Sequence, residues 1–179
     1  MKSYLLLTGA VLLLSLCWTL GIMAQIVEIP DNNLRAALES ALGKNAGEAI
    51  TDAELATLTE LDAPESSISD LTGLEHCVRL TSLRLWSNEI SDISPLANLT
   101  NMADLWLDSN WISDISALAN LTGLTGLWIS YNQISDVTAV SNLTKLTMLR
   151  LYGNEISDIS PLANLRQPYL TELYLQDNQ

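Results

Sequence analysis

The side chains of this sequence that are best suited to binding are large aromatic rings and charged groups at a regular spacing. Arg84, Trp106, Trp128 and Arg150 follow one another at intervals of 22 residues. Trp and Tyr rings that face solvent are unfavourable unless a partner covers them, and they are common anchors of interfaces. The predicted ligand-binding residues, which lie in this row or beside it, are Arg84, Trp86, Trp106, Asp108, Trp111, Trp128, Tyr131, Arg150, Tyr152 and Tyr174.

Side chains that could support catalysis are scarce. The chain has one His and two Cys. His76 has no Ser, Cys or carboxylate partner at a fixed spacing. Because an active site needs a nucleophile or an acid–base group in a defined constellation, we predict no enzyme activity and no cofactor.

A second recurring group is acidic. One Asp occupies the same position of each repeat, at Asp70, Asp92, Asp114, Asp136 and Asp158. Such a column of carboxylates could bind Ca²⁺, but Asp also accepts backbone hydrogen bonds at the start of turns. We favour the capping role, and we predict no dedicated metal site.

The overall charge excludes several classes of partner. The chain carries 8 Lys and Arg against 21 Asp and Glu, for a formal net charge of −13. A nucleic-acid binder needs a basic stripe, and electrostatic docking on an anionic membrane needs basic clusters. The hydrophobic content of 48% is too high for a disordered chain. We therefore expect a folded protein that contacts neither nucleic acid nor, beyond its leader, a membrane.

The first residues are typical of a secretory leader. A single Lys2 precedes a nearly continuous apolar run, and small Ala24 follows it. We predict a signal peptide over residues 1–24, with an uncleaved membrane anchor as the alternative. In both cases the rest of the chain is secreted or lies at the cell surface, and without the leader Cys77 is its one remaining thiol.

A repeat of 22 residues organises the remainder. Asn88, Asn110, Asn132 and Asn154 lie 22 apart, and the last step to Asn178 is 24. Around each Asn the apolar slots stay apolar, as in Leu80, Leu83, Leu85, Ile90, Ile93, Leu96 and Leu99. The pattern predicts five coils and an incomplete sixth over residues 58–179, with a short loop near residues 166–168. Cys77 occupies a slot that is Leu in later coils, so we expect a buried thiol.

The repeat dictates the architecture. Alternating leucines form a short strand, and successive strands stack about 4.8 Å apart in a parallel sheet. The Asn amide bonds backbone groups that the following turn would leave unpaired. We therefore predict an α/β fold, a right-handed leucine-rich repeat solenoid with a parallel concave β-sheet and a 3₁₀-like convex side.

Residues 25–57 do not repeat, and they predict an N-terminal helical cap. Asp31 is a good N-cap for the first helix, and Gly43 comes directly after the helical pattern, where Gly commonly ends a helix. Thr51 and Glu54 form a capping box for a second short helix that we expect to end near Leu58. The sixth coil stops one residue after Asn178, so we expect a fragment or the front of a longer protein.

Three motifs resemble bacterial internalin-type leucine-rich repeat proteins. They are the Ile29-Pro30-Asp31-Asn32-Asn33-Leu34 stretch, the Leu42-Gly43-Lys44 helix end and the coils that read NEISDISPLANLT. The resemblance covers about residues 27–179. It implies a secreted or surface-displayed module that binds a protein or a glycan on its concave face. No region resembles an immunoglobulin-like domain, a wall-sorting signal or a C-terminal anchor, so host-cell invasion is not implied.

The predicted register turns the large rings outward. Trp106 and Trp128 fall on adjacent strands and should be in contact, while no Trp or Tyr occupies a repeating core slot. We predict an extracellular, non-enzymatic recognition module, monomeric or part of a longer chain, that binds a protein ligand. The alternatives are a glycan-binding adhesin and a structural spacer in which the aromatic ladder only stiffens the sheet.

Overall fold

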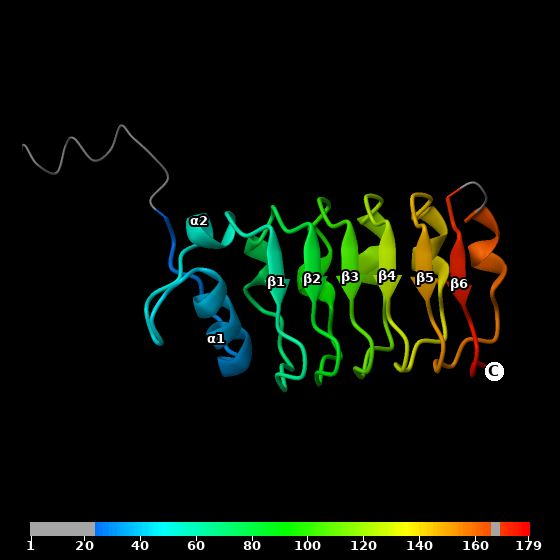
Figure 1. The fold of residues 1–179 in the computed structure, drawn as a ribbon, viewed down its shortest axis with the longest axis horizontal. Helices are drawn as coiled ribbons and strands as arrows, with labels where there is room; N and C mark the ends of the chain where they lie inside the picture. The colour runs from blue at the N-terminus through cyan, green and yellow to red at the C-terminus, as the bar shows by residue number, and fades with distance from the viewer. Residues whose placement is uncertain (1–23, 166–168) are drawn as a thin grey trace, which may run out of the picture.

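The computed structural model describes residues 24–165 and 169–179. The predicted leader and the predicted loop at 166–168 therefore lie outside the described residues. Successive coils line up in a row, with a parallel sheet along one side, short helices along the other and a helical cap at one end (Figure 1). The predicted solenoid architecture is confirmed. Within the described part, no helix is long and apolar enough to cross a bilayer.

The sheet contains one strand from each coil, in chain order. The strands are β1 (Glu60–Asp62), β2 (Ser82–Arg84), β3 (Asp104–Trp106), β4 (Gly126–Trp128), β5 (Met148–Arg150) and β6 (Glu172–Tyr174). The pairing partners from β1 to β5 are 22 residues apart, as in Leu83 with Leu105. On β5 and β6, Met148 pairs with Glu172, which is the predicted 24-residue step.

The opposite side of the solenoid consists of 3₁₀ helices, as predicted. They span Leu74–His76, Ser94–Leu96, Ser116–Asn120, Thr138–Asn142 and Ser160–Asn164. Each recurring Asp accepts the backbone N–H two residues later, as Asp114 Oδ1 does from Ser116 at 2.8 Å. The predicted capping role is confirmed. No cluster of three or more potential metal ligands occurs in residues 24–165 or 169–179.

The core is a continuous column of aliphatic side chains. The central Leu of β2, β3, β4 and β5 is fully buried, and no Trp or Tyr belongs to the buried core of the described residues. Two predicted core residues of the last coils are exceptions, since Ile159 is 54% exposed and Leu173 is 42% exposed. Each coil covers the apolar edge of the coil before it. Ile159 and Leu173 lie in the last two coils, which the described residues cover less completely.

The recurring Asn side chains hold the turns together from inside. Asn110 accepts the N–H of Ile90 at 3.0 Å and donates to the carbonyls of Leu85 and Leu107 at 3.0 and 3.1 Å. Asn88, Asn132, Asn154 and Asn178 make equivalent bonds. Each amide thus joins neighbouring coils by satisfying backbone groups buried away from water, as the spacing predicts.

The cap begins with α1 (Asn32–Ala41), and its N-cap is confirmed. Asp31 Oδ1 accepts the N–H groups of Asn33 and Leu34 at 2.9 Å. Its second oxygen accepts the Ser69 N–H at 2.8 Å, which ties the cap to the first coil. Burial of Asp31 disfavours the charged carboxylate and would raise its pKa. The hydrogen bonds from these backbone N–H groups outweigh that effect, so the pKa of Asp31 is lowered. Gly43 has a φ of +66°, which suits a residue that ends a helix.

The second helix, α2 (Asp52–Leu55), has the predicted capping box. The Glu54 N–H bonds Thr51 Oγ1 at 3.3 Å, and the Thr51 N–H bonds Glu54 Oε2 at 2.8 Å. A hydrogen bond from Lys44, with the Thr51 donors, lowers the pKa of Glu54 to about 2. The helix ends at Leu55, three residues before the predicted Leu58, and the chain continues in turns in which the Leu58 N–H bonds the carbonyl of Leu55 at 3.1 Å.

Cys77 is buried, as predicted, and we expect its thiol to be inert. It is 0% exposed, and burial raises the pKa of its thiol to about 12. Because only the thiolate reacts, a Cys17→Ser chain should react with a disulfide reagent at least about a thousandfold more slowly when folded than when unfolded. The check is a thiol-exchange time course at pH 8 with and without urea. Rapid native labelling would contradict the burial of Cys77.

Candidate functional site

The outward residues of the strands form a row of stacked groups. Arg84 lies over the Trp106 ring, with its Cζ 4.5 Å from the ring centroid. The Trp106 and Trp128 rings stack at 4.2 Å between centroids and 9° between planes, which confirms the predicted contact. Further along the row, the Cζ of Arg150 lies 5.0 Å from the centroid of the Tyr174 ring. The parallel register produces this row because it places side chains of equal slot directly beside one another.

The aromatic rings are less exposed than the sequence predicts. Trp86, Trp106, Trp128, Tyr152 and Tyr174 are half-buried because several of them pack against a neighbouring ring or guanidinium. Trp111 and Tyr131 are each 55% exposed, the highest values among the predicted ligand-binding residues. Tyr131 meets Tyr152 edge to face at 4.9 Å. The rings therefore form a packed but solvent-facing layer on the sheet.

Several predicted residues surround a shallow hollow of about 340 Å³ beside the C-terminal ends of the strands. Its lining residues are Trp86, Ser87, Trp106, Asp108, Ser109, Trp128, Tyr131, Arg150 and Tyr152. Arg84 and Tyr174 lie at its flanks through their contacts with Trp106 and Arg150. Trp111 does not line it. We call this feature the aromatic hollow.

A larger groove of about 670 Å³ lies between α1 and β1, at the cap end of the sheet. Small side chains such as Ala36, Ala37 and Ser40 line its helical wall. It has no aromatic side chain among its lining residues. The aromatic hollow, although smaller, contains all the aromatic side chains that line these two depressions.

Asp108 is the acidic group of the aromatic hollow. Burial raises the pKa of its carboxyl, and the Ser130 N–H and the charge of Arg150 only partly counteract this. The Ser130 N–H bonds Asp108 Oδ1 at 2.9 Å. Ser130 occupies an outward slot, yet it is 0% exposed, so the expectation that this slot faces solvent fails at Ser130.

Two glycines, which sequence reasoning missed, make room for the rings. A Cβ at Gly126 would lie 2.3 Å from Trp128 Cζ3, and one at Gly153 would lie 2.5 Å from Tyr131 Cδ1. The available signal was a departure from the repeat: the slot of Gly126 holds Ser82, Asp104 and Met148 in other coils.

Tyr131 has an unusual backbone conformation. Its φ is +53°, a region that bulky residues rarely adopt. The same slot of the other coils also has a positive φ, and it holds Glu65, Ser87, Ser109, Gly153 and Asp177. The repeat therefore imposes the turn, and the exposed Tyr131 ring lies at the edge of the aromatic hollow.

Gly126→Ala should disturb the ring stack without unfolding the protein. The new methyl overlaps the far edge of the Trp128 ring, which must swing away from Trp106. We expect the near-ultraviolet circular dichroism of the stacked pair to fall by about half or more, with a stability change within about 1 kcal/mol, because Ala suits a strand better than Gly. Ser82→Ala, in the same row, should change neither signal. An unaltered near-ultraviolet spectrum in Gly126→Ala would show that Gly126 does not position the ring.

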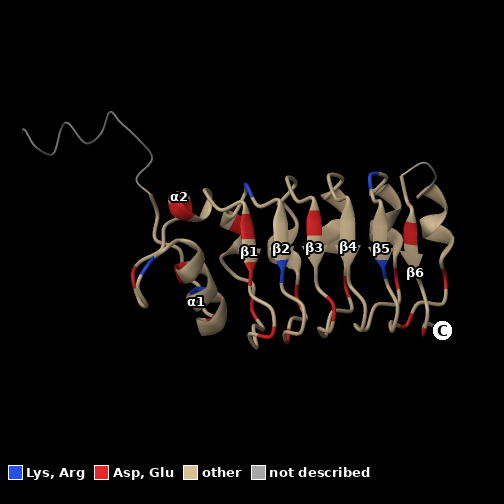
Figure 2. Cartoon of the chain, in the orientation of Figure 1, with Lys and Arg blue, Asp and Glu red and all other residues tan. Residues whose placement is uncertain are grey.

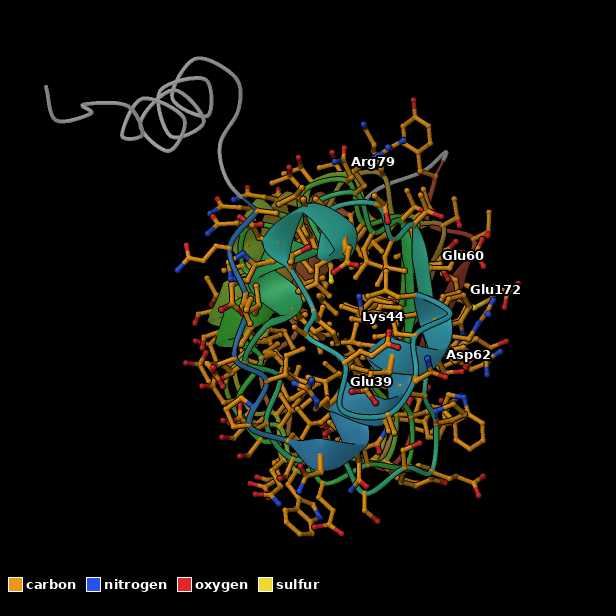
Figure 3. All side chains as sticks on the ribbon, turned by 90° about the vertical axis from the view of Figure 1, so that its left-hand side faces the viewer. Glu39, Lys44, Glu60, Asp62, Arg79 and Glu172 are labelled. Atoms are coloured by element: carbon orange, nitrogen blue, oxygen red, sulfur yellow. The ribbon has the colours of Figure 1, made fainter. Side chains whose placement is uncertain are left out.

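The strands carry more acidic than basic groups. The acidic segments lie on β1, β3 and β6, and the basic ones on β2 and β5 (Figure 2). Seen along the solenoid from the cap, Glu60, Asp62 and Glu172 are on the outer side of the sheet (Figure 3). A guanidinium nitrogen of Arg84 lies 3.7 Å from a carboxylate oxygen of Asp62, and this ion pair weakens the positive field of Arg84. The aromatic residues of the strands thus have a mainly acidic border.

Comparison with known proteins agrees with this architecture. The family described as Leucine Rich repeats (2 copies) matches residues 78–120, 100–142 and 122–164. Internalin J of Listeria monocytogenes serotype 4b (strain F2365) is 43% identical over 54 residues, which is 30% of this chain and 6% of that protein.

Solved structures extend the likeness to the whole fold. A crystal structure of an internalin (inlF) from Listeria monocytogenes matches with a TM-score of 0.80 and 35% identity, over 84% of this chain and 44% of that one. The leucine-rich repeat ectodomain of the plant receptor kinase GASSHO1/SCHENGEN3 from Arabidopsis thaliana, solved in complex with CASPARIAN STRIP INTEGRITY FACTOR 2, matches with a TM-score of 0.63 and 27% identity. It covers 70% of this chain and 16% of the receptor chain. The chain thus spans less than half of each of these proteins.

Proposed function

Because this chain is an internalin-type leucine-rich repeat protein, we propose that it is an extracytoplasmic, non-enzymatic recognition protein whose sheet binds a protein ligand. Leucine-rich repeat solenoids serve protein recognition in general, since stacked coils create an extended binding surface. The binding residues of the proposal are those of the aromatic hollow together with Arg84 and Tyr174 at its flanks.

The observation that carries the proposal is the aromatic hollow itself. Trp86, Trp106, Trp128, Tyr131 and Tyr152 line one depression on a surface that the described residues leave uncovered. A half-buried ring loses its remaining hydration when a partner covers it, and such rings dominate the binding energy of interfaces. The charged border supplies the polar rim that typical interfaces have.

The ring geometry favours a protein over a glycan. Sugar rings stack on free aromatic faces, but Trp106 lies between Arg84 and Trp128, and both contact its face. What this ring offers to a ligand is its edge. Ring edges and a shallow hollow suit the side chains of a protein surface better than the flat face of a sugar.

The spacer alternative predicts that the rings only stabilise the sheet. Against it, Tyr131 is 55% exposed, although a ring that only stiffened the sheet would gain more by packing onto it. An enzyme is disfavoured because the charged groups that line the aromatic hollow are one carboxylate and one guanidinium, and among the described residues no hydrogen bond joins the Ser87 or Ser109 hydroxyl to a base.

The test uses this protein in labelled form in two parallel binding assays. One assay presents a set of extracellular proteins, and the other presents a glycan array. Capture of a protein that is lost on Trp106→Ala/Trp128→Ala supports the proposal. Binding to glycans alone would support the adhesin alternative. Absence of any ring-dependent capture, with a normally folded chain, would leave the spacer reading and refute the proposal.

A further inference from the structure

The aromatic hollow contains the Asp108 carboxylate, which is influenced by the charge of Arg150 but forms no ion pair with it. Asp108 accepts the Ser130 N–H through Oδ1 at 2.9 Å. None of the ion pairs of the described residues includes Asp108. A half-buried carboxylate is less well hydrated than one on an open surface, so a cation that enters the aromatic hollow gains more from pairing with it.

The nearest cation of the aromatic hollow is engaged elsewhere. Arg150 lies over the Tyr174 ring of the next strand, at 5.0 Å from its centroid. Its Nε is buried and has no hydrogen-bond partner among the described residues. Because Arg150 contacts this ring and forms no hydrogen bond to Asp108, the carboxylate has no cationic hydrogen-bond donor among the described residues.

The surroundings of the aromatic hollow also attract positive charge. The acidic residues of the strands are Glu60, Asp62, Asp104 and Glu172, against the two bases Arg84 and Arg150. The whole chain has a net charge of −13. Such a field steers a basic partner toward the sheet and repels an acidic one.

From these observations we propose that the aromatic hollow receives a lysine or arginine side chain of the protein partner, with Asp108 as its counter-ion. This inference rests on the proposed function. Trp86, Trp128 and Tyr152 pack against the aliphatic stem of that side chain. The Asp108 carboxylate accepts its hydrogen bonds, which are strong because both partners are charged.

The experiment uses small probes in place of the unknown partner. The amidated, N-acetylated forms of arginine, lysine, norleucine and glutamate are titrated into the full chain, and the indole N–H signals of the tryptophans are followed by NMR. We expect saturable shifts with the arginine and lysine probes, with affinities at least about fivefold above that of norleucine, which keeps the stem but lacks the charge. The glutamate probe should not bind.

Two matched variants identify the counter-ion. Asp108→Asn keeps an acceptor for the Ser130 N–H and should lower the affinity for the arginine probe about fivefold to tenfold. Asp104→Asn, on β3 but outside the aromatic hollow, should change this affinity less than about twofold. Melting curves confirm that both variants fold. Equal binding of norleucine and arginine, an unaffected Asp108→Asn, or no saturable binding would overturn the inference. Capture of a protein by the aromatic hollow is measured in the separate binding assay described above. These outcomes would therefore overturn this inference without contradicting the proposed function.

Discussion

Replacing Trp106 and Trp128 by Ala should abolish ligand capture while the fold persists. The stacked pair forms one wall of the aromatic hollow, and buried Trp anchors each contribute 2 kcal/mol or more to typical interfaces. We expect the affinity for a captured protein to fall at least about a hundredfold, measured by surface plasmon resonance. Stability should decrease by about 1–3 kcal/mol, because the rings are half-buried and their stacking adds about 0.5–1.5 kcal/mol.

The control for this variant is Trp111→Ala. Trp111 is 55% exposed and does not line the aromatic hollow, so its removal should alter the affinity less than about threefold. Comparable losses from both variants would mean that the ligand covers a wider surface than the aromatic hollow. A large fall in melting temperature with unchanged affinity in the double variant would instead favour a structural role for the rings.

Replacing Asn132 by Ala should cause a large loss of stability. Its amide donates to the carbonyls of Leu107 and Ile129, at 3.0 and 3.2 Å, and its oxygen accepts the Ile112 N–H at 2.9 Å. These backbone groups are buried, and a methyl group would leave them without partners. Since each unsatisfied buried group costs about 1–3 kcal/mol, we expect a loss of about 3–4 kcal/mol and a melting temperature lower by roughly 10 °C.

The matched control is Asn142→Ala at the end of the fourth-coil 3₁₀ helix. This Asn is exposed, and its replacement should change stability by less than about 0.5 kcal/mol. Urea unfolding followed by circular dichroism measures both variants. If Asn132→Ala were no worse than Asn142→Ala, the interior amides would not be what holds adjacent coils together.

The repeated residues were sufficient to predict the architecture. A slot that is apolar at each interval of 22 residues must face the interior, because one coil cannot bury its apolar face alone. The Asn ladder, the Asp caps of the 3₁₀ helices and the buried Cys77 follow from the same register. The caps at Asp31 and Thr51 depend on neighbours within three residues, so local sequence predicted them too.

The aromatic hollow, in contrast, depends on contacts across coils that the repeat does not encode. Register sets which slots lie side by side, but the direction of a ring depends on the space that its neighbours leave. Gly126 and Gly153 leave that space for Trp128 and Tyr131. Ser130 is buried beside the Asp108 carboxylate, and the burial of Asp108 itself raises the pKa of that carboxyl. The sequence by itself thus determined the coils and the residues that share a face. The tertiary structure decided how those residues form a hollow, since packing among side chains 22 residues apart sets their torsions, burial and charge.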